Sequence, residues 1–183
     1  LVRNFSFKRP PVHLIRHPCA VVASQMRFGA WSNVPTSFSE SEIDSDPLLV
    51  PHKSILLEID TIEERLAAFW AMTNAIALNH FARGTKWTTI YYEELLGDPI
   101  SVVEGILDRW QVETSIPIQA LASQPSGTTI GGSPVLTGNT EKQLTYWKSS
   151  LNAEQVRRVL SMVHKLGVRD YDEDPYPLAR KLQ

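Results

Sequence analysis

The sequence predicts an α/β fold in which a mostly parallel sheet is flanked by helices. Two short runs rich in apolar, β-branched or aromatic residues have the composition of strands. Two of the predicted helices begin at a proline that follows such a run, a third shows helical spacing of apolar residues, and a fourth follows the predicted N-cap Asn152. Alternation of strands and helices is typical of parallel sheets. The predicted elements are strand 11–16, helix 18–28, helix 61–82, strand 88–92, helix 99–110 and helix 152–165.

The first strand and its helix have the features of a phosphate site. The apolar residues Val12, Leu14 and Ile15 predict a buried strand that ends at Arg16, and Pro18 then opens a helix. A guanidinium beside the free N–H groups and the positive dipole end of a helix suits a phosphate. The alternative is an arginine that forms a solvated ion pair.

Three further residues of this segment carry polar or reactive groups. Ser24 adds a hydroxyl donor on the same helix, and His17 lies beside the predicted phosphate. His17 is at least as well explained as a side chain that caps the helix N-terminus. We expect Cys19, in the first turn, to be a small buried hydrophobic residue rather than a reactive thiol.

The first strand and its helix resemble the 3′-phosphate-binding segment of the PAPS-dependent sulfotransferases, whose donor is 3′-phosphoadenosine 5′-phosphosulfate. In that family an apolar strand ends in Arg and is followed by Pro, a helix with Ser and usually an Arg; here these are Arg16, Pro18, Ser24 and Arg27. His17 stands where the family more often has Asp. Residues 88–99 resemble a second family segment, in which a strand is followed by Tyr-Glu-Asp/Glu-Leu and then by Asp-Pro.

The resemblance implies a fold related to the P-loop nucleotide-binding class, with PAPS or its product as cofactor and no metal. Arg16 and Ser24 would then hold the 3′-phosphate and Tyr92 would approach the adenine. Glu93 would be a structural carboxylate near the nucleotide. The implied reaction transfers a sulfuryl group to a hydroxyl or amine of a small-molecule or carbohydrate acceptor.

The groups that perform the chemistry in the family do not occur before Arg16. They are a Gly-Thr-Thr loop for the 5′-phosphosulfate, its basic residue and a general base, so we expect the catalytic residues upstream of Leu1. The chain would be truncated at its N-terminus and inactive alone. The segment 124–129, Gln-Pro-Ser-Gly-Thr-Thr, lacks a basic residue and a following helix, and is predicted to be a polar loop.

Two other functions stay open. The chain is also compatible with a phosphotransferase of P-loop ancestry, in which Arg16 meets a different phosphate. It is also compatible with a non-catalytic sulfotransferase-like remnant or interaction domain.

Further along the chain, Trp147 and Leu151 resemble the family's closing segment, and Asn152 is predicted to cap the last helix.

Composition is that of a single globular domain over 1–183. The chain has 43% hydrophobic residues, a net charge of −2 and one cysteine. This charge argues against nucleic acid as the main partner, and no apolar run approaches the length of a membrane span. We expect a cytoplasmic protein, although a lost upstream segment is compatible with a targeting signal or anchor. The oligomeric state is not predicted.

The remaining polar segments do not indicate another chemistry. The five histidines lack metal-ligand spacing, so no metal site is expected. The acidic run 170–175 lacks the spaced ligands of a calcium loop and is predicted to be a solvated tail. Residues 31–51 are rich in Ser, Pro and Asp, which is typical of a lid or acceptor-binding loop.

Overall fold

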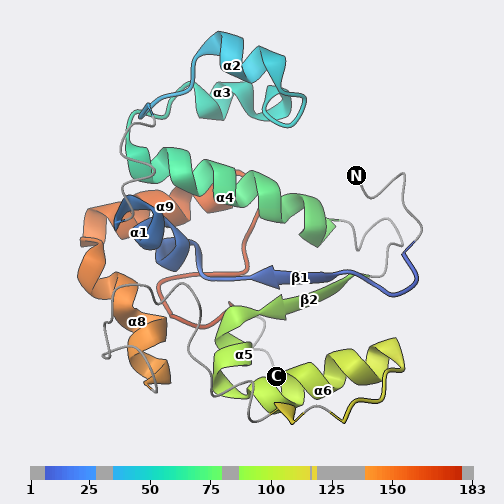
Figure 1. Ribbon diagram of the computed structural model, residues 1–183. Coiled ribbons are helices and arrows are strands. Elements are labelled where there is room, and N and C mark those ends of the chain that lie inside the picture. Colours follow the sequence, from blue (N-terminus) through green and yellow to red (C-terminus); the bar gives the residue numbers. More distant parts are fainter. Residues whose placement is uncertain (1–6, 28–34, 80–86, 116, 119–138, 179–183) are drawn as a thin grey trace.

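A computed structural model describes residues 7–27, 35–79, 87–115, 117–118 and 139–178. The described chain is mostly helical and contains a small two-stranded parallel sheet with helices beside it (Figure 1). The predicted α/β class and the six predicted elements are confirmed. The elements are β1 (Val12–Ile15), α1 (Pro18–Arg27), α2 (Glu40–Ser45), η3 (Val50–His52), α3 (Lys53–Leu56), α4 (Ile62–Asn79), β2 (Thr88–Tyr91), α5 (Tyr92–Gly97), α6 (Pro99–Trp110), α8 (Thr140–Ser150) and α9 (Ala153–Lys165).

The two strands pair in register along their whole length. Val12 lies opposite Thr88 and Ile15 lies opposite Tyr91. Because the pairing is parallel, both carboxyl ends lie at the same edge, and the residues that follow the strands come together there. This edge is where ligands bind in open α/β sheets.

The prediction that β1 is buried is correct for Ile15 and wrong for its neighbours. Ile15 is 1% exposed, whereas Leu14 is 50% exposed and Val12 is 36% exposed. Side chains alternate between the two faces of a strand, so one apolar run supplies both faces. Only the face that carries Ile15 is covered within the described residues.

The hydrophobic core lies where α1, α4, α8 and α9 pack together. Leu66 and Trp70 of α4 and Val159 and Val163 of α9 are buried in it. The aromatic residue Trp70 is thus a core residue, as its helical spacing predicts. Thr61 and Glu64 cap the start of α4, with the Glu64 N–H donating to Thr61 Oγ1 over 3.4 Å.

Helix α6 packs against α5 and lies on the side of β2 away from α4 (Figure 1). Trp110 at its end donates from Nε1 to the carbonyl of Pro10 over 2.9 Å. Its start is capped by Asp98, whose side chain accepts from the Ser101 N–H. Pro99 at the first helical position therefore acts as predicted.

The segment between α1 and α4 contains helical structure that was not predicted. The described part of the predicted lid or acceptor-binding loop 31–51 contains α2 and the start of η3, α3 follows, and residues 28–34 lie outside the described ranges. Arg65 of α4 is 4% exposed and contacts this segment. Its Nη2 pairs with Glu42 over 2.5 Å, and its guanidinium lies 4.0 Å from the ring centroid of Phe38.

Candidate anion site at the ends of the strands

Arg16 and Tyr92, two of the three predicted binding residues, meet at the carboxyl edge of the sheet. Each directly follows its strand, and the parallel register brings them side by side. The Arg16 Cζ lies 4.5 Å from the centroid of the Tyr92 ring. A guanidinium over an aromatic face gains electrostatic attraction from the ring and is held in one orientation.

The Arg16 side chain is half-buried, and its guanidinium has no hydrogen bond or ion pair among the described residues. Its charge acts on Glu93, whose carboxylate it stabilises. A partly buried guanidinium with unused donors is suited to an anionic ligand that presents two oxygens.

The start of α1 corrects one element of the predicted site. The Cys19 N–H donates to Nδ1 of His17 over 3.2 Å, and the Ala20 and Val21 N–H groups donate to the His17 carbonyl. Pro18 has no N–H. The first turn therefore offers no free amide to a phosphate, because the His17 side chain caps the helix. The capping alternative for His17 is confirmed.

Ser24, the third predicted binding residue, lies further along α1. Its side chain is half-buried, and no described hydrogen bond joins it to Arg16. Arg27, at the end of the same helix, donates to the hydroxyl of Tyr146 on α8 over 3.4 Å. The structure therefore brings Arg16 and Tyr92 together, and it leaves Ser24 as a separate hydroxyl on the helix that follows.

The buried carboxylate of Glu93 accepts a hydrogen bond from the turn that follows Arg16. Glu93 is 1% exposed; its Oε1 accepts from the His17 backbone N–H over 2.9 Å, and its Oε2 accepts from the Tyr171 hydroxyl over 3.0 Å. Burial raises the pKa of Glu93, and the two hydrogen bonds partly offset that rise. Glu93 is therefore a structural carboxylate beside the candidate site, whereas Glu94 next to it is half-buried.

The ring of His17 is enclosed by aromatic side chains. It stacks on Trp147 with ring centroids 4.6 Å apart and meets the edge of Tyr171 at 4.9 Å. Nε2 lies 2.9 Å from the carbonyl of Asp172, so Nε2 carries the proton and Nδ1 accepts from Cys19. Burial lowers the pKa of His17 to about 4, which keeps the ring neutral near pH 7.

The acidic segment near the C-terminus is not the solvated tail that was predicted. Tyr171 within it is fully buried, and Asp170 accepts a hydrogen bond from the Tyr91 hydroxyl over 2.8 Å. The carboxylates of Asp172 and Asp174 accept from backbone N–H groups two residues on, so they form turns. We call residues 166–178 the C-terminal strap. The sequence signal for this packing is Tyr171, an aromatic residue between acidic ones.

Cys19 is confirmed as a buried structural residue. It is fully buried in the first turn of α1, and burial raises the pKa of its thiol to about 12. The neutral thiol is a poor nucleophile.

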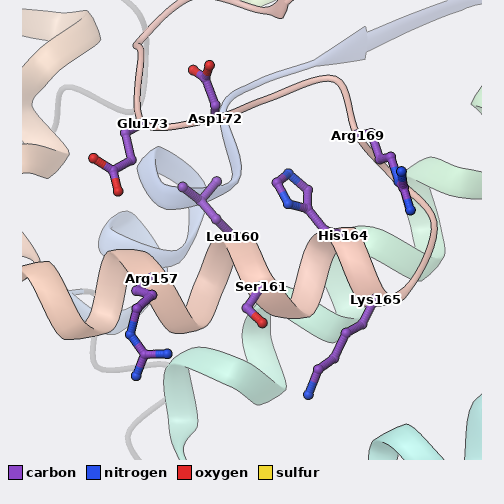
Figure 2. Close-up of a pocket in the computed structure, with 8 residues that line it drawn as sticks. All are labelled: Arg157, Leu160, Ser161, His164, Lys165, Arg169, Asp172 and Glu173. Atoms are coloured by element: carbon purple, nitrogen blue, oxygen red, sulfur yellow. The ribbon is translucent and has the colours of Figure 1, made fainter.

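A second concave region lies between α9 and the strap. The hollow has a volume of about 600 Å³. In Figure 2, Leu160 and His164 point toward the strap, while Ser161 and Lys165 point to the other side of α9. The side chains do not converge on one point. The hollow is therefore a surface groove between α9 and the strap, and it is not the candidate site. It is lined by Arg157, Leu160, Ser161, His164, Lys165, Arg169, Asp172 and Glu173.

Within the described ranges, no three His, Cys, Asp or Glu side chains are grouped to hold a metal ion, and no helix is long and apolar enough to cross a membrane. The loop at 124–129 lies outside those ranges. Comparisons of the chain with protein-family models, with curated proteins and with solved structures found no match.

Proposed function

We propose that the chain binds the 3′-phosphate of PAPS, or of its product adenosine 3′,5′-bisphosphate, as part of a sulfotransferase of the P-loop nucleotide-binding class. The observation that carries this proposal is the Arg16 guanidinium, stacked on Tyr92 and without a described hydrogen-bond partner. It lies at the carboxyl edge of a parallel sheet, where nucleotides bind in related architectures.

Each proposed role follows from the chemistry of the side chain. Arg16 would present two parallel N–H donors to two oxygens of a doubly charged phosphate. Ser24 would donate from its hydroxyl to the same group. The Tyr92 ring, which already holds Arg16, would lie on the side of the adenine. The amides of α1 take no part in this scheme because His17 satisfies them.

The proposed reaction passes a sulfuryl group from PAPS to an acceptor oxygen or nitrogen. The new S–O or S–N bond forms while the S–O bond to the phosphate breaks, and a general base takes the acceptor proton. Arg16, Ser24 and Tyr92 would bind the donor and leave its reacting end free. We assign no residue of this chain to the chemical step, because no Gly-Thr-Thr loop precedes Arg16 and no His or Glu lies upstream of the strand that ends at Arg16.

Nucleotide preference tests the proposal. The chain is titrated with adenosine 3′,5′-bisphosphate, ADP and AMP, and binding is followed by calorimetry and by thermal unfolding. At a hundredfold excess over Kd, a ligand raises the free energy of unfolding by about 2.7 kcal/mol. The proposal predicts this response for the 3′,5′-bisphosphate and little for the other two. An equal response to ADP would favour a phosphotransferase, and no response to any of the three would favour a non-catalytic domain.

A further inference from the structure

The C-terminal strap reaches the Arg16 turn through one buried carboxylate. Glu93 Oε2 accepts from the Tyr171 hydroxyl over 3.0 Å, and Oε1 accepts from the His17 N–H over 2.9 Å. Glu93 and Tyr171 are both almost completely buried, at 1% and 0% exposure. A ligand at the edge of the sheet therefore does not reach either of them, and their effect on it must pass through the residues that they hold.

The bond to His17 acts on the peptide unit that Arg16 shares. Arg16 contributes the carbonyl of this unit and His17 contributes the N–H. A peptide unit is planar, and the Cα of Arg16 lies in the same plane as the His17 N–H. A hydrogen bond that holds the N–H therefore also orients this plane. The direction in which the Arg16 side chain leaves the turn depends on that plane. Glu93 in turn keeps its own rotamer because the Tyr171 hydroxyl holds its second oxygen.

We propose that Glu93 and Tyr171 are positioning residues for Arg16, so that the hydrogen bond between Tyr171 of the C-terminal strap and Glu93 sets the anion affinity of the site. The inference rests on the proposed function, since it concerns the same arginine. It goes further in assigning to the strap, which is remote in sequence, a part in forming the site. Electrostatics alone would have the opposite effect, because a negative Glu93 weakens the attraction of Arg16 for an anion.

A matched pair of tyrosine variants tests the proposal. Tyr171→Phe and Tyr91→Phe each remove one hydroxyl that donates to a carboxylate between sheet and strap, but only Tyr171 bonds to Glu93. We expect Tyr171→Phe to weaken binding of adenosine 3′,5′-bisphosphate roughly tenfold, and Tyr91→Phe to weaken it less than about twofold. Both variants are compared with the wild-type chain by calorimetry.

A second readout needs no nucleotide. The Arg16 Cζ lies 4.5 Å from the centroid of the Tyr92 ring, so we expect NMR of the free protein to show the Arg16 side-chain protons shifted upfield by the ring current. Tyr171→Phe should reduce this shift, and Tyr91→Phe should leave it. If the wild-type chain binds no nucleotide but the shift still depends on Tyr171, the proposed function fails and the positioning stands. A shift that survives in both variants, or is lost equally in both, overturns the inference.

Variants of Glu93 keep the proposal testable if Tyr171→Phe does not fold. Glu93→Gln keeps the length and an oxygen acceptor but removes the charge, whereas Glu93→Asp keeps the charge and is too short to span both partners. Positioning predicts that Glu93→Gln retains the ring-current shift and that Glu93→Asp loses it. The reverse order would show that the charge of Glu93 matters and its geometry does not, and would overturn the proposal.

Discussion

The imidazole of His17 lies flat on the indole of Trp147, with the two rings 16° from parallel. The contact joins the turn after β1 to α8, while Nε2 of the same ring bonds the carbonyl of Asp172 in the strap. A single residue thus connects three segments that are far apart in sequence. Protonation of His17 at Nδ1 would remove the acceptor of the Cys19 N–H and place a charge in this buried environment.

The first prediction concerns the pH dependence of stability. His17 has an ordinary pKa of 6.5, which the fold lowers to about 4, mainly by burial. Because the folded-state pKa is the lower one, the unfolded chain binds the proton first as the pH falls. The contribution of His17 to the free energy of unfolding is therefore complete above pH 6.5 and decreases between 6.5 and about 4. The full change is on the order of 3 kcal/mol.

Urea unfolding of the wild type and of His17→Asn, measured across this pH range, isolates the effect. The raised pKa of Glu93 acts with the opposite sign, but it is present in both proteins and cancels in the comparison. We expect the wild type to lose stability more steeply than the variant as the pH falls. Equal slopes for the two proteins would contradict the neutral, buried state of His17.

The second prediction concerns Arg16. Arg16→Ala should weaken binding of adenosine 3′,5′-bisphosphate by about 1.5–3 kcal/mol, because a charged hydrogen bond is lost. Arg16→Lys should recover part of this loss, since an ammonium supplies the charge without the planar fork. Calorimetry measures both variants, with circular dichroism as the control for folding. Unchanged affinity in a folded Arg16→Ala protein would rule out Arg16 as the phosphate ligand.

The third prediction concerns Arg65 and the segment 35–59. Arg65→Ala removes a guanidinium that contacts Phe38 and Phe69 and pairs with Glu42. We expect a loss of stability of about 3 kcal/mol, together with faster proteolytic cleavage within 35–59. Glu42 is partly exposed, so Glu42→Gln should cost less than about 1 kcal/mol. Cleavage rates that do not differ between Arg65→Ala and the wild type would show that this segment is held by other contacts.

The fourth prediction concerns the thiol of Cys19. It is fully buried, and its pKa is raised to about 12, so a disulfide reagent should modify it only when the fold opens. At pH 8 the native protein should react at least about a hundredfold more slowly than the protein in denaturant. The absorbance of the released thiolate follows the reaction. Rapid labelling of the native chain would place Cys19 at the surface instead.

The sequence by itself determined the strand–helix segments of this protein. Pro18 and Pro99 open helices, and Asn152 caps α9 with a complete capping box with Gln155, because these effects act between residues a few positions apart. The placement of Arg16 and Tyr92 at the ends of the strands also follows from local pattern, although each strand ends one residue earlier than predicted. Parallel pairing then brings them together, as the α/β pattern predicts.

Only the tertiary structure decided which polar residues are buried. Glu93 and Tyr171 each lie beside other acidic residues, a pattern that is typical of a protein surface. Neither pattern reveals that the Tyr171 hydroxyl donates to the Glu93 carboxylate, 78 positions away in the sequence. Leu14, by contrast, reads as core and lies half exposed, because no described element covers its face of β1. Burial depends on which distant segments pack against a residue, and the free energy of that packing is shared among all of them. Short-range propensity therefore located the helices and strands, while long-range packing set the protonation of His17 and the partners of Glu93.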